Sequence, residues 1–96
     1  MSRVVYARKS FEDIERLADF LIDVNRSAAW HTGKIIQDGI SVLERHPLIG
    51  RPVEAGLREL VVSRGRSGYV ALYRYDVARD EVMILALRHQ RETGGD

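Results

Sequence analysis

Cysteine is absent from this chain of 96 residues. The absence excludes a disulfide framework and any metal site built on thiolates, and it agrees with a reducing compartment, so the cytoplasm is the expected location. The three histidines, His31, His46 and His89, are far apart in the sequence and lack the paired spacing of metal ligands, so we predict no metal. The glycine-loop patterns that bind phosphate or dinucleotides are absent too, so we predict no cofactor.

The chain also lacks charge imbalance and long apolar runs. Fifteen Lys and Arg stand against fourteen Asp and Glu, so a formal net charge of +1 draws the whole molecule neither to nucleic acid nor to a membrane surface. No run approaches the roughly 18 apolar residues that a membrane span requires, and basic residues interrupt the N-terminus, which therefore has no signal core. We expect a soluble cytoplasmic protein with one domain over residues 1–96, frayed from about residue 93.

Two segments have apolar residues at the spacing of an amphipathic helix. The first follows Ser10, which we expect to be its N-cap, and acidic residues fill its first turn. The second follows Ser27 as its cap, continues to about Arg45 and ends before Pro47. Because the turn between them is short, the two helices are predicted to form an antiparallel hairpin.

The remaining segments are rich in β-branched and aromatic residues and are separated by polar turns, which is typical of strands. These segments are residues 3–7, 57–62, 68–76 and 81–87. The order along the chain predicts an α+β fold, in which an opening strand and the helical hairpin precede a three-stranded antiparallel meander. We expect the hairpin to cover one face of the sheet.

Both prolines of the chain lie in the stretch "HPLIGRPVEAGLREL", residues 46–60, together with two arginines, Arg51 and Arg58. Pro47 ends the second helix, and Gly50 with Pro52 is predicted to turn the chain so that the next strand enters the sheet. All the basic residues except Lys9 and Lys34 are arginines, and six of the thirteen arginines lie between residues 45 and 75, where the only acidic residues are Glu54 and Glu59. We therefore predict a basic side of the molecule and, in the first helix, an acidic one.

Two polar residues in the expected strands have more than one interpretation. His89 follows the apolar run "MILAL" and is a candidate general base, or a half-buried residue that ends a strand. Arg74 alternates with tyrosines, and its guanidinium suits a phosphate or merely a nearby carboxylate. The sequence leaves both choices open.

The aromatic residues raise the same kind of question. Tyr69, Ala71, Tyr73 and Tyr75 share one face of an expected strand, where an aromatic row either stacks on bases or packs in the core under the hairpin. Trp30 lies off the main apolar stripe of the second helix. It is a candidate partly exposed anchor for a partner, or a packing residue of the hairpin.

Taken in order, four segments resemble the RelE/ParE superfamily of toxins from bacterial type II toxin–antitoxin modules. They are "HPLIGRP", "LRELVV", "GYVALYRYD" and "VMILALRHQRE", preceded by the helical hairpin and the opening strand, and the resemblance extends from Val4 to about Glu92. It implies a small compact toxin that a cognate antitoxin neutralises by laying a C-terminal segment over its surface. Contact with DNA is then expected only indirectly, through the antitoxin.

The resemblance leaves two branches with different targets. RelE-like members cut mRNA in the ribosomal A site, and a catalytic arginine that is common among them corresponds here to Val70. ParE-like members inhibit DNA gyrase, and the ending "LRHQRE" is similar to theirs. We therefore favour a ParE-like toxin that binds and poisons gyrase without being an enzyme, partnered by a ParD-like antitoxin with a ribbon-helix-helix start.

The alternative is a RelE-like, ribosome-dependent mRNA endoribonuclease. Its charge stabilisation and proton transfer would come from five candidate catalytic residues. These are Arg64, Arg66, Arg74, His89 and Arg91. A third possibility is an inactive family member that only binds its antitoxin.

The antitoxin interface carries its own prediction. The toxin must leave open a surface that its partner covers, with exposed apolar residues ringed by charge. The candidate antitoxin-binding residues are Trp30 as the apolar anchor and Arg51, Arg58 and Arg74 as contacts for a carboxylate-rich segment. We expect such a segment to be disordered when free and to fold on binding.

Overall fold

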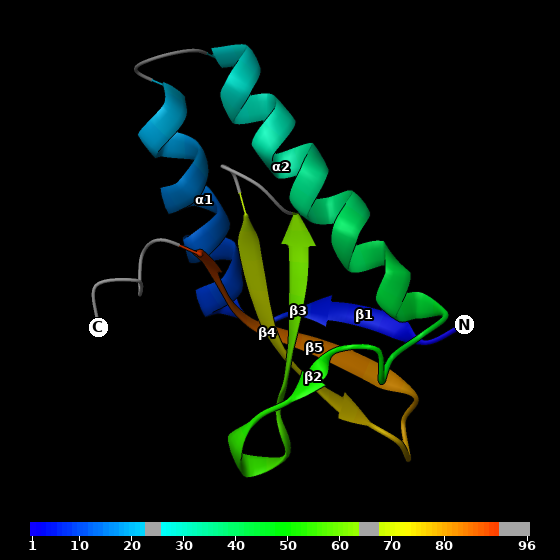
Figure 1. Cartoon of the computed structure of the whole chain (residues 1–96). Helices are drawn as coiled ribbons and strands as arrows, with labels where there is room; N and C mark the ends of the chain where they lie inside the picture. Colours follow the sequence, from blue (N-terminus) through cyan, green and yellow to red (C-terminus); the bar gives the residue numbers. More distant parts are fainter. Residues whose placement is uncertain (23–25, 64–67, 91–96) are drawn as a thin grey trace.

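The computed structural model describes residues 1–22, 26–63 and 68–90 (Figure 1). Its α-helices are α1 (Arg8–Ile22) and α2 (Arg26–Ile40), and its short 3-10 helices are η1 (Ser41–Glu44) and η2 (Glu54–Gly56). Its strands are β1 (Arg3–Tyr6), β2 (Arg51–Pro52), β3 (Arg58–Ser63), β4 (Tyr69–Asp76) and β5 (Glu81–His89). The predicted α+β fold, with an opening strand, a helical hairpin and an antiparallel meander, is confirmed.

The strands form one sheet in the order β1-β5-β4-β3-β2. The pairs β2–β3, β3–β4 and β4–β5 are antiparallel, whereas β1 pairs with β5 in parallel. The first and last strands of the chain are therefore adjacent in the sheet (Figure 1). Helix α1 packs against β5 and α2 against β3, which places both helices on the same face of the sheet. In the described part of the chain, no helix packs on the other face, which is called the open face below.

The core lies between the hairpin and the sheet. Its most buried members from the helices are Ile36, Ile40 and Leu43, which follow the helical spacing of the predicted stripe. On β4 the row that begins with Tyr69 and includes Tyr73 faces the helices, and both of these tyrosines are buried. The core interpretation of this aromatic row is therefore confirmed.

The predicted helix starts need small corrections. Ser10 is not the N-cap of α1, because the helix already begins at Arg8, and the Ser10 hydroxyl donates back to the Ala7 carbonyl over 2.6 Å. Helix α2 begins at Arg26, one residue before the predicted cap at Ser27. Its predicted end near residue 45 holds, but the last turn tightens into η1.

A buried carboxylate joins α1 to the edge of β5. Strand β1 pairs with β5 only as far as Ile84, and a β-bulge at Leu85 shifts the register between β4 and β5. Beyond it, the Leu87 N–H donates to Asp13 Oδ2 over 2.8 Å, so a side chain of α1 replaces a strand partner. Asp13 is only 3% exposed and also accepts from Lys9 and Arg16.

Those contacts determine the titration of Asp13. Burial alone would raise the pKa of this carboxyl, but the hydrogen bonds from Leu87, Lys9 and Arg16 outweigh it and hold the pKa below its usual range. Asp13 is therefore ionised near neutral pH, and the four hydrogen bonds that it accepts from Lys9, Arg16 and Leu87 are then charge-assisted.

Candidate functional site

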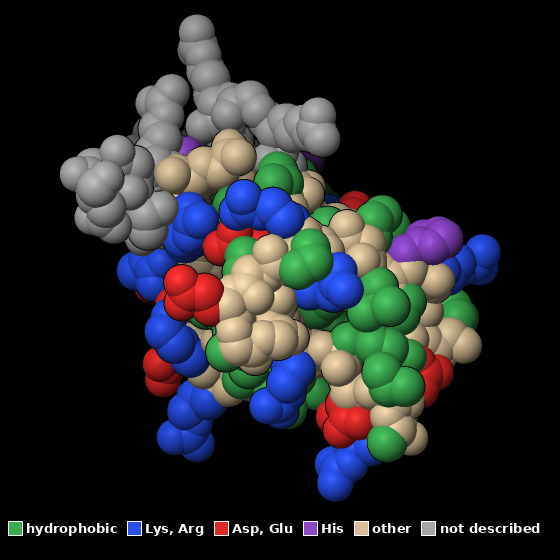
Figure 2. Space-filling view, turned by 60° about the horizontal axis from the view of Figure 1, so that its bottom comes forward, with side chains coloured by type: hydrophobic (Ala, Val, Ile, Leu, Met, Phe, Trp, Pro, Cys, Tyr) green, Lys and Arg blue, Asp and Glu red, His purple; other side chains and the backbone are tan. Residues whose placement is uncertain are grey.

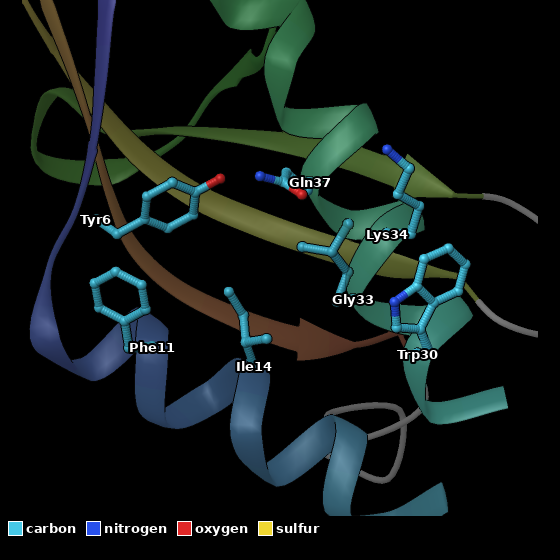
Figure 3. Close-up of a pocket in the computed structure, with 8 residues that line it drawn as sticks. Tyr6, Phe11, Ile14, Trp30, Gly33, Lys34 and Gln37 are labelled. Carbon is cyan, nitrogen blue, oxygen red and sulfur yellow. The ribbon is translucent and has the colours of Figure 1, made fainter. Parts of the chain in front are cut away.

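The helical hairpin carries an open groove of about 620 Å³ (Figure 3). Its lining comes from β1, α1 and α2 and is mainly apolar and aromatic. The residues are Tyr6, Phe11, Ile14, Trp30, Gly33, Lys34, Ile36 and Gln37. No helix in the described part of the chain is long and apolar enough to cross a membrane.

Two large aromatic side chains mark the ends of the groove. Phe11 has the helical spacing of Ile14 and Leu17, yet it is 55% exposed and lies beside Tyr6 with ring centroids 5.4 Å apart. Trp30, at the other end, is 66% exposed, which confirms the interpretation that it stands off the core (Figure 3). The space beside Gly33 is open, because a Cβ built there would meet no atom within 4 Å.

The polar groups of the groove are few. Lys34 lies at its rim and is 3.6 Å from Asp38 one helical turn later. The Tyr6 hydroxyl points into the groove near Gln37 (Figure 3). Burial, and secondly the Glu44 carboxylate, raise the pKa of Tyr6, so its phenol stays neutral near physiological pH. The groove thus offers aromatic surface with one cation at its edge.

The stretch around Gly50 is held by groups from two strands. The Arg58 guanidinium donates from Nη1 to the carbonyls of Leu48 (3.0 Å) and Gly50 (2.8 Å). The Gly50 N–H donates to the buried Tyr73 hydroxyl over 2.8 Å. A Cβ at Gly50 would lie 2.6 Å from the Tyr73 ring and hydroxyl, so only glycine fits. The concentration of Gly, Pro and Arg in this part of the sequence is thus explained by one rigid loop.

We expect Tyr73→Phe to lower the free energy of unfolding by about 1–3 kcal/mol, since the buried Gly50 N–H loses its acceptor. Burial raises the pKa of Tyr73, although the Gly50 bond and Arg58 oppose this, so the hydroxyl is neutral in the folded protein. Urea unfolding measures the change. The matched control is Tyr75→Phe, which removes an exposed bond to Asp80 and should cost much less; equal losses would contradict the prediction.

The candidate antitoxin contacts lie in different places. Arg51 projects from β2 with its side chain 77% exposed and pairs with Glu59 at 2.8 Å. Arg58 is committed to the loop carbonyls. Arg74 is exposed on the open face of the sheet, opposite the face on which the hairpin and Trp30 lie. The structure brings Arg51 and Arg58 near each other, but not to Trp30.

The candidate ribonuclease residues are only partly described. Arg64, Arg66 and Arg91 lie outside the described residues. His89 is paired with Tyr69 across β4 and β5, and their rings meet edge to face at 5.4 Å, so His89 shares the helix-covered face. Arg74 lies on the opposite, open face. The two described candidates are therefore separated by the sheet.

Sequence reasoning missed one arginine of the open face. Arg88 lies opposite Val70 in the register of β4 and β5, and its Nη2 is 3.6 Å from the Glu59 Oε2 atom. Strand alternation from His89 was the signal that could have placed it there.

Figure 2, turned so that the bottom of the molecule comes forward, shows hydrophobic side chains with Lys and Arg side chains around them. Within the described residues, no group of three or more His, Asp or Glu could hold a metal.

Comparison with known proteins gives this architecture a family. Residues 4–94 match the family model of the ParE toxin of the type II toxin–antitoxin system parDE. The chain is 34% identical over 92 residues to Toxin RelE3 of Caulobacter vibrioides, covering 96% of this chain and 98% of that protein.

Two solved structures share the fold. A chain of the chromosomal ParDE system from P. aeruginosa superposes with a TM-score of 0.75 at 22% identity, covering 93% of this chain and 96% of that one. A chain of the RelBE2 toxin–antitoxin complex from Mycobacterium tuberculosis gives a TM-score of 0.65 at 22% identity, covering 93% and 98%. A hairpin over a mixed sheet is thus the fold of RelE/ParE superfamily toxins. The chain belongs to the ParE toxin family of type II toxin–antitoxin systems.

Proposed function

We propose that this toxin binds and inhibits DNA gyrase and that a cognate ParD-like antitoxin neutralises it. The observation that carries the proposal is the match to the ParE toxin family over residues 4–94, nearly the whole chain. The geometry agrees with a binding protein, because His89 and Arg74 lie on opposite faces of the sheet. The family resemblance also implies that Val70 occupies the position of an arginine common in RNA-cutting relatives. Inhibition by binding needs a surface rather than an active site.

The groove on the hairpin is the proposed seat of the antitoxin. Its exposed aromatic side chains at Phe11 and Trp30 would be covered by apolar residues of a segment that folds on binding. Exposed arginines such as Arg51 would attract the carboxylates of that segment during the encounter. The solved relatives named above come from toxin–antitoxin systems, which supports an antitoxin partner here.

The purified toxin is expected to block the supercoiling of relaxed plasmid by DNA gyrase with ATP. Prior incubation with the antitoxin should restore the reaction, which separates specific inhibition from a contaminant. The measurement is the fraction of supercoiled plasmid on a gel as toxin concentration rises. Unchanged supercoiling at saturating toxin would count against gyrase as the target.

The second candidate is a RelE-like, ribosome-dependent endoribonuclease that acts on mRNA. Two observations favour it: the 34% identity to a protein named Toxin RelE3, and the arginines Arg74 and Arg88 on the open face of the sheet. Primer extension on translated messages tests it. Codon-phased cuts that vanish with His89→Ala or Arg74→Ala would replace gyrase inhibition as the proposed activity.

A further inference from the structure

The Tyr6 hydroxyl differs from the other three tyrosine hydroxyls of the chain, because it forms no hydrogen bond with the described residues. The other three are hydrogen-bonded inside the fold: Tyr69 with Thr32 (3.5 Å), Tyr73 with the Gly50 N–H (2.8 Å) and Tyr75 with Asp80 (2.7 Å). Tyr6 instead points its hydroxyl into the groove on the hairpin, toward Gln37 (Figure 3). The Gln37 amide likewise has no hydrogen-bond partner among the described residues.

Both polar groups lie among apolar side chains. Phe11, Ile14 and Ile36 line the same groove, and Phe11 lies beside the Tyr6 ring. Within the described residues no fully buried side-chain oxygen or nitrogen lacks a hydrogen bond, so the Tyr6 hydroxyl still meets solvent in the free toxin. A partner that fills the groove removes this water. The two groups are then left unsatisfied unless the partner brings a polar group to them, and an unsatisfied group weakens binding.

The character of the two groups selects an uncharged partner group. A neutral phenol and an amide each donate and accept hydrogen bonds, and the side-chain amides and hydroxyls of a partner complement them in both respects. A carboxylate fits less well at this point of the groove, because the Glu44 carboxylate is close enough to Tyr6 to raise its pKa and would repel a second negative charge. The cation at the rim, Lys34, already has Asp38 at 3.6 Å and does not reverse this preference.

We propose that Tyr6 and Gln37 determine which antitoxin this toxin accepts, by hydrogen-bonding one amide or hydroxyl side chain of the segment that fills the groove. This rests on the proposed function, because the groove must be the seat of the antitoxin. The aromatic and aliphatic lining attracts any apolar segment, whereas a site built to hydrogen-bond a polar group rejects a segment that lacks it. The polar pair therefore also fixes the register of the bound segment.

The test compares Tyr6→Phe with Tyr75→Phe, each of which removes one hydroxyl and keeps the ring. Tyr75 does not line the groove, and its hydroxyl binds Asp80. The dissociation constant for the cognate antitoxin is measured by isothermal titration calorimetry, and the unfolding midpoint by circular dichroism. We expect Tyr6→Phe to weaken binding by about tenfold or more without a change in the midpoint, because only the complex loses a hydrogen bond. Tyr75→Phe should bind within about twofold of the wild type.

A second variant and a scan of the antitoxin make the result specific. Gln37→Met keeps the length of an exposed side chain but removes its amide, so it should weaken binding too, and it carries the test if Tyr6→Phe does not fold. Replacing each amide and hydroxyl residue of the antitoxin segment in turn by alanine locates the partner group. At one position the loss of affinity should be large for the wild-type toxin and small for Tyr6→Phe.

Two results overturn the proposal: wild-type affinity of the folded Tyr6→Phe and Gln37→Met variants, or equal losses for both toxins at every antitoxin position. Trp30→Ala separates this failure from that of the groove itself. If Trp30→Ala dissociates faster while the two polar variants bind normally, the antitoxin still fills the groove and only the role of Tyr6 and Gln37 is refuted. If none of the three variants changes binding, the groove is not the antitoxin seat and both proposals fail.

Discussion

Asp13→Ala is expected to lower the free energy of unfolding by about 3 kcal/mol. The substitution leaves the buried Leu87 N–H without its acceptor and removes charge-assisted bonds to Lys9 and Arg16. An unsatisfied buried donor costs about 1–3 kcal/mol, and a hydrogen bond to a charged group contributes about 1.5–3 kcal/mol. Chemical denaturation at pH 7 measures the loss. The control is Glu15→Ala on the exposed side of the same helix, which should stay within about 0.5 kcal/mol.

Asp13 also makes the free energy of unfolding depend on pH in the acid range. The pKa of Asp13 is lower in the folded protein than in the unfolded chain, so its contribution is fully present above the unfolded pKa near 4 and is lost as the pH falls through the folded value. Wild-type stability should therefore decline below about pH 4 more steeply than that of Asp13→Ala. Parallel declines of the two proteins would show that Asp13 does not carry this dependence.

Trp30→Ala is expected to speed dissociation of the antitoxin by about 30-fold or more. Trp30 is 66% exposed at one end of the hairpin groove, and truncating a central aromatic anchor of an interface typically costs 2 kcal/mol or more. Such losses appear mainly in the dissociation rate. Surface plasmon resonance with the immobilised antitoxin measures both rates.

Two variants make that result specific. Ile35→Ala changes an exposed apolar residue of the same helix that does not line the groove, and it should leave dissociation within a few-fold. Arg51→Ala should instead slow association, and more so at low salt, because exposed charges act mainly on the encounter. If Trp30→Ala dissociates no faster than Ile35→Ala, the antitoxin binds elsewhere. Arg58→Ala is not suitable for testing an antitoxin contact, because it also removes the hydrogen bonds from Arg58 to the backbone carbonyls of Leu48 and Gly50.

Local sequence patterns were sufficient to predict most of the fold. Helical spacing predicted an apolar stripe that includes Ile36 and Ile40, and strand alternation put Tyr73 on one face with Tyr69 and Tyr75, because both periods depend only on neighbouring residues. The sequence left open whether that face packs in the core, and the structure shows that it does. The parallel pairing of β1 with β5 was not predicted, since it joins segments almost a chain length apart. The β-bulge at Leu85 was missed for a related reason: it arises from the register between two strands rather than from either strand alone.

In the candidate site, too, local patterns were informative and contacts between distant residues were not. The place of Trp30 off the apolar stripe left both exposure and packing in the hairpin possible, and the structure shows exposure. The exposure of Phe11 was not predicted, because Phe11 has the spacing of the stripe but lies where the groove stays open. Arg58 was predicted to contact carboxylates of the antitoxin, because it is an arginine in the basic part of the sequence. Its actual partners are backbone carbonyls eight and ten residues earlier, and no sequence pattern distinguishes such a contact from a carboxylate partner.

The position of β5 also bears on how the toxin is made. Strand β5 lies between β1 and β4, and it supplies Leu87 to Asp13, so β1 and the buried carboxylate of α1 both depend on residues 81–89. During translation these residues leave the ribosome after all the other strands. A nascent chain that stops before Glu81 has no partner for β1 and lacks the strand against which α1 packs. The cell therefore meets the folded toxin only when synthesis of this domain is nearly finished, and a prematurely terminated product lacks the framework on which its surfaces are built.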